Sequence, residues 1–245
     1  CYKAMKETHE YANYHNYEVR ATLPSYNIYK LDDINPIIIK TNTDWNNATI
    51  VIHDENINNL QTKDYPIFRI ESTEENISIT DILNILHPQD HEPLIQLLSQ
   101  LTNKEIQQGN ITLRFYNEEE KQYIRSGYNK DEGQGKTDIF NIDDEGNVLN
   151  EIQWDFNKIT QIILVPIPKE ELTLQNATII TRLPYDNYEQ ESGYFNRSIT
   201  CNRSNTVIKN VKHQVDDIEK IGGPYYGFIR LSYVTNIKLT IYAQI

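Results

Sequence analysis

The sequence predicts a mainly β protein of the parallel β-helix class, and three observations lead to that prediction. The chain of 245 residues is rich in Ile and Asn and contains 17 Tyr but only 9 Gly. Ile and Tyr favour strands, whereas Asn favours turns and left-handed backbone. An Asn begins a short alternating strand at six positions, with separations of 29, 34, 66, 29 and 31 residues. A period near 30 residues is typical of stacked repeats. The six positions are Asn47, Asn76, Asn110, Asn176, Asn205 and Asn236.

The third observation is the content of each repeat, which holds strands rather than helix pairs and so excludes the helical solenoids. Gly is too sparse for the Gly-rich calcium-binding β-rolls, and a parallel β-helix remains. Asn at an equivalent turn of successive coils can stack into a hydrogen-bonded ladder and tolerates left-handed geometry. A composition rich in Asn and Ile can also produce such matches by chance. The alternation within the matches, however, is better than composition requires.

The first segment, residues 1–79, is expected to hold a capping helix and the first coils. Tyr2, Met5, His9 and Ala12 fall at helical spacing. The chain then passes through a turn into YNIYK and PIII, an order that suits a cap closing the first coil. Residue 1 is Cys, and the last residues, NIKLTIYAQI, stop within a strand. We therefore expect the chain to be a piece of a longer protein.

The middle segment, residues 80–168, interrupts the repeat and is expected to form an inserted α+β lobe. An apolar stripe between Leu94 and Leu101 follows Pro93 at helical period, which predicts an amphipathic helix. Residues 169–245 return to Asn-initiated strands. They are expected to form further coils, truncated at the C-terminal end.

The charge of the chain disfavours several classes of partner. With 23 Lys and Arg against 35 Asp and Glu, the net charge is −12, which disfavours binding to nucleic acid and docking on anionic membranes. No apolar run approaches 18 residues, so no transmembrane helix is expected. The two cysteines, Cys1 and Cys201, do not make a disulfide framework, and whether they are free stays open.

Two motifs that resemble sites of known chemistry fail on their spacing. Residues 133–137, GQGKT, end like a phosphate-binding loop, but Lys130 stands where the first Gly is needed, so we expect an ordinary loop. His87 and His91 have a spacing that suits a metal, but Pro88 places a helix start between them. We therefore expect no metal and no cofactor, and the sequence assigns no catalytic residue.

The sequence resembles a known superfamily in several stretches. The helix YKAMKETHEYANYHN, followed by YNIYK, IIIKTNTDWNNATIVI and PIFRIES, resembles the opening of right-handed parallel β-helix proteins of the pectate-lyase-like superfamily. The late stretches NTVIKNVKHQV and GGPYYGFIRLSYVTNIKLTIY resemble the middle coils of these proteins. The middle lobe is similar to inserts in β-helix proteins of phage tails and gut-bacterial surfaces. The resemblance implies a right-handed parallel β-helix.

The resemblance also implies a function. Members of the superfamily are commonly tail spikes, tail appendages, and secreted proteins that bind or degrade polysaccharides. We expect a module of a phage tail spike or appendage that recognises a host-surface glycan, located on the virion or extracellularly, and assembled as a homotrimer. The alternative is a secreted bacterial carbohydrate-active enzyme, a polysaccharide lyase or glycoside hydrolase, whose catalytic site lies beyond Ile245. A purely structural virion protein is the third possibility, because fold alone does not choose among them.

The expected glycan site lies in the late coils, where tyrosines cluster near an arginine. Consecutive coils lie about 4.8 Å apart, so a groove along the stack can gather residues about 30 positions apart. Aromatic rings can stack on a sugar face, and carboxylates can accept hydrogen bonds from hydroxyl groups. The competing interpretation buries these tyrosines between the coils and the lobe. The expected site residues are Tyr225, Tyr226, Arg230, Tyr233, Asp216 and Asp217.

Overall fold

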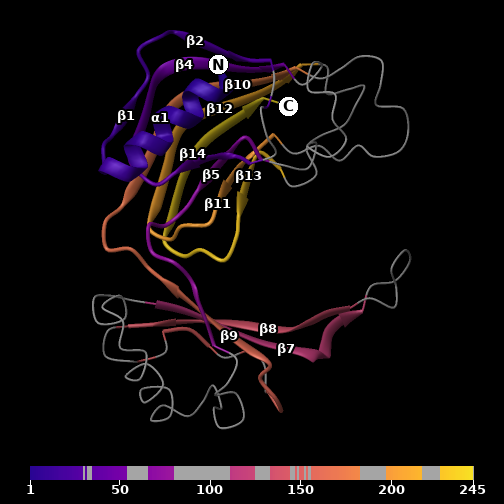
Figure 1. Cartoon of the computed structure of the whole chain (residues 1–245). Coiled ribbons are helices and arrows are strands. Elements are labelled where there is room, and N and C mark those ends of the chain that lie inside the picture. Colours follow the sequence, from indigo (N-terminus) through magenta and orange to yellow (C-terminus); the bar gives the residue numbers. More distant parts are fainter. Residues whose placement is uncertain are drawn as a thin grey trace. The chain divides into compact units, whose positions relative to one another are not determined.

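The computed structural model (Figure 1) contains one helix and fourteen strands in its described part. The described residues are 1–29, 31, 35–53, 66–79, 111–124, 133–143, 147, 149–151, 153, 156–182, 197–216 and 227–244. The helix expected between Leu94 and Leu101, and the pair His87 and His91, lie outside these residues. Within them, no helix has the length and apolar character needed to cross a membrane.

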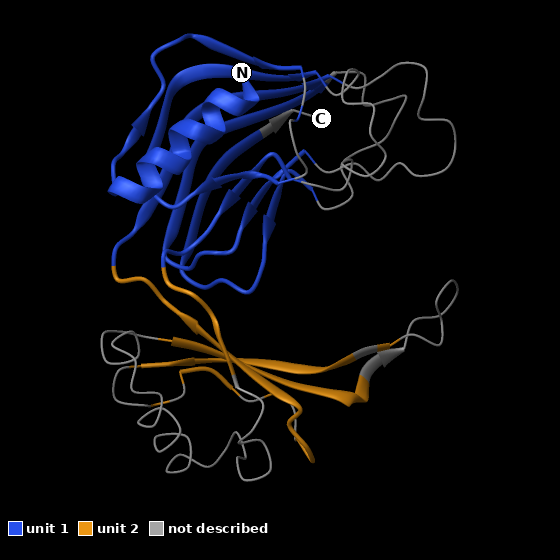
Figure 2. Cartoon of the chain, in the orientation of Figure 1, with its two compact units in different colours: residues 1–73, 170–245 blue, residues 74–169 orange. Residues whose placement is uncertain are grey.

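The chain divides into two compact units, coloured separately in Figure 2. Unit 1 comprises residues 1–73 and 170–245, and unit 2 comprises residues 74–169. Unit 1 contains helix α1 and two parallel sheets, whereas unit 2 contains an antiparallel sheet.

The larger parallel sheet of unit 1 has the order β1-β4-β10-β12-β14, with β2 also paired to β4, and the smaller has the order β13-β11-β5-β3. From β3 onward, the strands of unit 1 alternate between the two sheets along the chain, so each pass adds one strand to each sheet. Figure 1 shows β4, β10, β12 and β14 side by side. The strands are β1 (Val19–Arg20), β2 (Ser25–Ile28), β3 (Ile37–Ile39), β4 (Thr43–His53), β5 (Phe68–Ile70), β10 (Leu172–Arg182), β11 (Ile199–Cys201), β12 (Thr206–Asp216), β13 (Ile229–Leu231) and β14 (Ile237–Gln244).

The parallel pairing expected for the late Asn-initiated strands is confirmed. Leu172 pairs with Thr206, and Thr206 pairs with Ile237. The repeat prediction is wrong at Asn76 and Asn110. The strands that follow these two residues, β6 and β7, pair antiparallel to β9 in unit 2. An Asn followed by an alternating run therefore does not distinguish a coil strand from a strand of an antiparallel sheet.

The expected asparagine ladder is present in unit 1. Asn210 Nδ2 donates to Asn176 Oδ1 at 3.0 Å, and Asn176 Nδ2 donates to Asp44 Oδ1 at 2.9 Å. Between the next pair of strands, Asn236 Nδ2 donates to Asn205 Oδ1 at 2.8 Å. All four asparagines have left-handed backbone, with φ between 53° and 60°, which Asn tolerates better than most residues. Each ladder therefore links neighbouring strands through both backbone shape and side-chain hydrogen bonds.

The interior of unit 1 consists of apolar rows that run across the paired strands. Ile39, Ile70 and Cys201 occupy one register position in the smaller sheet and are fully buried. On β13 the row continues with Leu231, which is 44% exposed because no further described strand covers it. Trp45 is buried against Phe68, with ring centroids 5.1 Å apart. The rows give unit 1 a continuous core across both sheets.

Helix α1 (Tyr2–His15) buries one face against this core. Its buried residues are Tyr2, Met5, His9 and Ala12, the set expected from helical spacing. Asn13 fixes the helix to the strand beside it, because its Nδ2 donates to Ile38 O at 2.8 Å and its Oδ1 accepts from Lys40 N–H at 2.9 Å.

Unit 2 contains a sheet of order β6-β9-β7-β8 around Phe115 and Phe140. Its strands are β6 (Ile77–Ile79), β7 (Ile111–Ile124), β8 (Gly133–Ile142) and β9 (Gln161–Pro166). The GQGKT stretch belongs to β8, so the expectation of a loop there is wrong. The strand begins at Gly133, the first residue of this stretch, although glycine is uncommon in strands.

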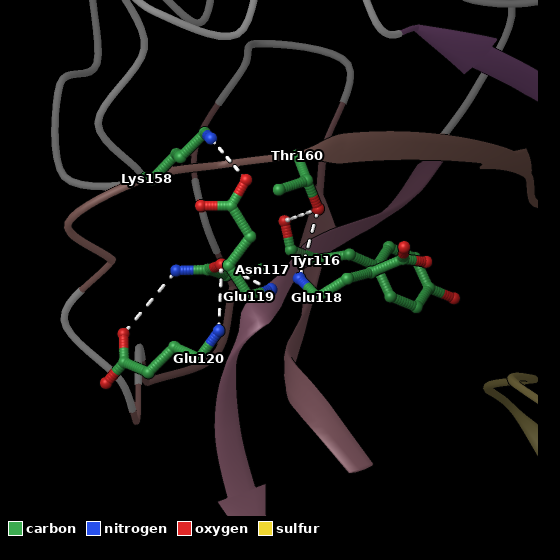
Figure 3. A network of polar contacts seen from close by, with 7 residues as sticks. All are labelled: Tyr116, Asn117, Glu118, Glu119, Glu120, Lys158 and Thr160. Carbon is green, nitrogen blue, oxygen red and sulfur yellow. Dashed lines mark hydrogen bonds and ion pairs between the residues drawn. The ribbon is translucent and has the colours of Figure 1, made fainter. Parts of the chain in front are cut away.

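Opposite these glycines, β7 bulges between Asn117 and Lys121 (Figure 3). Asn117 Oδ1 accepts the backbone N–H groups of Glu119 and Glu120 at 3.1 and 3.2 Å, and Thr160 Oγ1 accepts that of Glu118 at 3.1 Å. Lys158 pairs with Glu119, and Lys136 pairs with Glu120 at 3.0 Å. Each of these polar groups therefore has a hydrogen-bond or ion-pair partner within the group. We interpret this network of contacts as support for the bulge.

Candidate functional site

The six residues expected to bind glycan are only partly described. Tyr225, Tyr226 and Asp217 lie outside the described residues, and for Asp216 the structure gives the backbone alone. Arg230 lies on β13 opposite Thr200, and Tyr233 follows β13 with 48% of its side chain exposed. Asp216 ends β12 opposite Arg182 in the other sheet. The strand pairing therefore does not bring Arg230 and Asp216 together, and the late-coil site stays a prediction.

A second group of aromatic side chains lies at the C-terminal end of α1 and is well exposed. We call Tyr11, Tyr14, His15 and Tyr17 the aromatic cluster. The ring of His15 lies 4.3 Å from that of Tyr11, 4.9 Å from that of Tyr14 and 5.4 Å from that of Tyr17, the last nearly parallel. Tyr11, Tyr14 and Tyr17 are 61%, 85% and 56% exposed. The four rings therefore form an aromatic surface open to solvent.

The local sequence explains why these rings gather. Residues three and four apart in a helix share a face, so Tyr11, Tyr14 and His15 lie together on the side opposite the buried face of α1. The helix ends at Asn16 in left-handed geometry, with φ 55°. The backbone N–H of Tyr17 then donates to Ala12 O at 2.9 Å. This C-terminal turn brings the Tyr17 ring back towards the helix.

Beside the aromatic cluster lies a polar cleft of about 210 Å³, to which Tyr17 also belongs. Its wall combines carboxylates, cationic groups and amides from four separate parts of unit 1. The lining residues are Asn16, Tyr17, Glu18, Lys40, Thr41, Asn42, Glu170, Glu171, Leu172 and Arg203. The chain thus places hydrogen-bond donors and acceptors next to exposed aromatic rings.

One cation in the polar cleft has a structural task. Arg203 is 8% exposed and donates to Glu170 O at 2.7 Å, Asn205 O at 2.8 Å and Ser204 O at 3.2 Å. A guanidinium group suits such a cluster of carbonyl acceptors because it carries five N–H donors in a fixed plane. Arg203 therefore links the backbone at Glu170 to the backbone at Ser204 and Asn205.

Other polar groups in the polar cleft bond to one another or lie at its rim. Asn42 Nδ2 donates to Glu18 Oε1 at 3.2 Å, while its Oδ1 accepts from Thr173 N–H at 2.8 Å. These bonds fix the Asn42 amide and leave Glu18 exposed at the rim. Thr41 Oγ1 is buried and has no hydrogen-bond partner among the residues that the structure describes. A hydroxyl group of a ligand can bond to both the Glu18 carboxylate and a fixed amide.

A second cleft of about 300 Å³ adjoins the polar cleft and shares Glu18 and Asn42 with it. It extends over β1, β4, β10 and β12, where Arg20, Asp44, Gln175 and Lys209 line it. The two clefts together therefore extend across neighbouring strands of the larger sheet. In the described residues, no group of three or more metal-ligating side chains lies close enough together to hold an ion.

The sequence contains a signal for the aromatic cluster in HEYANYHNY, where aromatic rings recur at helical spacing. The prediction of a capping helix used only the apolar face of this segment. No family model matches the chain, and the search of curated proteins finds no relative.

Proposed function

We propose that unit 1 is a right-handed parallel β-helix whose first coil is closed by α1. The strands of unit 1 alternate between two parallel sheets, and strands about 31 to 34 residues apart stack in register, which supports this proposal. The asparagine ladders between these strands give the same support.

We also propose that the chain is a glycan recognition module of a phage tail spike, tail appendage or similar virion protein. The observation that best supports this proposal is the exposed aromatic cluster beside the polar cleft. Aromatic rings stack on the apolar face of a sugar, and polar groups at the ring edge bond to its hydroxyl groups. The resemblance to phage-tail and surface β-helix proteins adds the location, on the virion or outside the cell.

The charge of the site suggests which glycan it takes. Glu18, Glu170 and Glu171 line the polar cleft together with two cations, Lys40 and Arg203, of which Arg203 is already bonded to backbone carbonyls. Glu171 is paired with Lys238 at 2.8 Å, but Glu18 remains exposed. On a chain with net charge −12, such a lining favours neutral sugars over acidic ones.

A screen on a glycan array tests this proposal. Tyr14→Ala removes the most exposed ring of the aromatic cluster and is expected to weaken binding by a factor of about 2 to 13, since one aromatic contact contributes roughly 0.5–1.5 kcal/mol. Tyr242→Ala is the matched control, because Tyr242 is 55% exposed and lies on β14. Binding that survives Tyr14→Ala but is lost in Tyr233→Ala would move the site to the late coils.

The alternative function is cleavage of the same class of substrate, as in a secreted carbohydrate-active enzyme. The observation that favours it is the set of three glutamates in one cleft, because glycoside hydrolysis uses two carboxylates that flank the scissile bond. Release of reducing ends from the glycan identified on the array would establish cleavage. Binding without release supports recognition alone.

The proposed homotrimer is tested separately. Trimeric assembly is suggested by the resemblance to tail spikes and not by any contact in unit 1. Light scattering of the full-length protein is expected to give the mass of three chains. The mass of one chain would remove the trimer and favour the secreted enzyme.

A further inference from the structure

The bulge of β7 brings a lysine, an asparagine and a glutamate together in unit 2. Asn117 on β7 is the register partner of Lys136 on β8. Residues paired in this way lie on one face of the sheet, with Cβ atoms about 4.5–5.5 Å apart. Asn117 is 4% exposed and Lys136 is 7% exposed. A buried primary amine therefore lies beside a buried side-chain amide.

Glu120 bridges these two side chains. Its Oε1 accepts from Lys136 Nζ at 3.0 Å, and its Oε2 accepts from Asn117 Nδ2 at 3.5 Å, a contact drawn in Figure 3. One carboxylate thus contacts the amine, which can attack the amide carbon, and the amide nitrogen, which can leave. A carboxylate in that position can carry a proton from one nitrogen to the other.

The oxygen of the same amide accepts two hydrogen bonds from the backbone. Asn117 Oδ1 bonds to the N–H groups of Glu119 and Glu120 at 3.1 and 3.2 Å. Donors in fixed positions stabilise the negative charge that develops on a carbonyl oxygen when a nucleophile attacks its carbon. The bulge supplies these donors, because the pairing of β7 with β8 is interrupted between Asn117 and Lys121.

An aromatic ring covers the lysine. The centroid of the Phe156 ring lies 5.6 Å from Lys136 Nζ, and Phe156 is 3% exposed. Exclusion of water strengthens the electrostatic interactions in a site and suppresses hydrolysis as a side reaction. The side chain of Glu120 is 43% exposed, so the site is open to solvent on the carboxylate side, where a small product can leave.

We propose that Asn117 and Lys136 form an intramolecular isopeptide bond, with Glu120 as the proton carrier. Glu120 takes one proton from the Nζ ammonium group, and the resulting amine attacks Asn117 Cγ while negative charge collects on Oδ1. Glu120 then gives this proton to Nδ2 and takes a second proton from Nζ, the Cγ–Nδ2 bond breaks, and ammonia leaves. The ammonia takes the second proton from Glu120. One amide replaces another, so the reaction needs no oxidant, reductant or cofactor.

The bond joins two neighbouring strands of the antiparallel sheet covalently. It closes a ring through residues 117–136, which restricts the unfolded chain as a disulfide does. Unlike a disulfide, an amide is not broken by thiols. This inference concerns unit 2 alone and does not depend on the glycan site proposed in unit 1.

Mass spectrometry of the full chain tests the proposal. The intact mass is expected to be lower than the mass calculated from the sequence by one ammonia molecule. Digestion should yield a fragment in which the peptide containing Asn117 is joined to the peptide containing Lys136. An intact mass equal to the calculated one would overturn the proposal. Loss of ammonia without the joined fragment would also overturn it, because an asparagine can lose ammonia by cyclising onto its own backbone.

Three variants assign the roles of the side chains. Lys136→Arg keeps the positive charge but removes the amine, so its intact mass should equal the calculated one. Glu120→Gln cannot accept the proton, and the cross-linked fraction of the freshly purified protein is expected to fall at least about tenfold. Glu119→Gln is the matched control, because Glu119 lies in the same bulge but pairs with Lys158, and it should keep the cross-link. Equal cross-linked fractions in the two glutamine variants would overturn the role of Glu120.

Discussion

Replacement of Asn176 by Ala is expected to destabilise unit 1, because it removes the middle member of an asparagine ladder. Asn176 donates to Asp44 at 2.9 Å and accepts from Asn210 at 3.0 Å. Its backbone is left-handed, with φ 60°. The substitution therefore removes two hydrogen bonds and places an alanine where its Cβ crowds the following carbonyl group.

The expected loss in the free energy of unfolding is about 2–5 kcal/mol. Each hydrogen bond contributes roughly 0.5–1.5 kcal/mol net, and left-handed backbone costs a residue other than Gly or Asn roughly 1–2 kcal/mol. Asn176→Gly is the matched control. It also removes both hydrogen bonds but adopts the left-handed geometry without strain. We expect the Gly variant to be more stable than the Ala variant by about 1 kcal/mol.

Urea unfolding followed by Trp45 fluorescence measures these differences in unit 1. Trp45 is buried in that unit, and a Trp154→Phe background makes it the single tryptophan. The reasoning would be refuted if the free energies of unfolding of both variants lay within about 0.5 kcal/mol of the parent value. Such a difference corresponds to about one weak hydrogen bond.

The carboxyl group of Asp44 gives a second readout of the same ladder. Burial raises its pKa, but hydrogen bonds from Asn176, the Asn46 N–H and Gln175, together with the charge of Arg20, outweigh burial and lower it below its usual value. Loss of the Asn176 bond is therefore expected to raise the pKa of Asp44. NMR titration of the Asp44 carboxyl group in both variants measures that change, and an unchanged value would contradict the ladder.

Two further predictions concern pH and the bulge of unit 2. Burial lowers the pKa values of His9 and His213 from 6.5 to about 4, so the unfolded chain binds more protons than the folded chain as the pH falls from 6.5 to 4. Unit 1 should accordingly lose about 1.3 kcal/mol per histidine between pH 7.5 and 5.5. Urea unfolding at the two pH values measures this loss, and equal stability would contradict it. In unit 2, Gly135→Ala would place a Cβ 3.0 Å from Glu118 Cα and 3.1 Å from Asn117 O, so the bulge must shift at a cost of roughly 1–3 kcal/mol. Calorimetry should show a lower midpoint of thermal unfolding for unit 2. An unchanged midpoint would show that β7 and β8 accommodate the added Cβ at the bulge without cost.

The sequence is sufficient to predict the parallel strands of unit 1 but not to say which Asn-initiated strands belong to it. Asn176, Asn205 and Asn236 precede or interrupt strands that pair in parallel, as expected. Asn76 and Asn110 carry the same local pattern but lead into antiparallel strands. The pattern encodes a turn and an alternating strand, whereas the direction of pairing depends on partners far away in the chain.

The aromatic cluster was missed for a related reason. Helical spacing predicts correctly that Tyr2, Met5, His9 and Ala12 are buried, and it leaves the opposite face to solvent. It does not show that the left-handed turn at Asn16 returns Tyr17 to His15, nor that residues about 155 positions later, Glu170 and Glu171, line the adjoining cleft. These neighbours follow from the stacking of β10 on β4. Sequence spacing alone does not contain that contact.

A crystal structure of the chain with the oligosaccharide selected on the glycan array tests the central claim most directly. We expect a sugar ring stacked on Tyr14 or Tyr17 at the end of α1. Its hydroxyl groups should bond to Glu18 and Asn42 in the polar cleft. A sugar bound at Arg230 and Tyr233 instead, with the aromatic cluster left bare, would contradict the account.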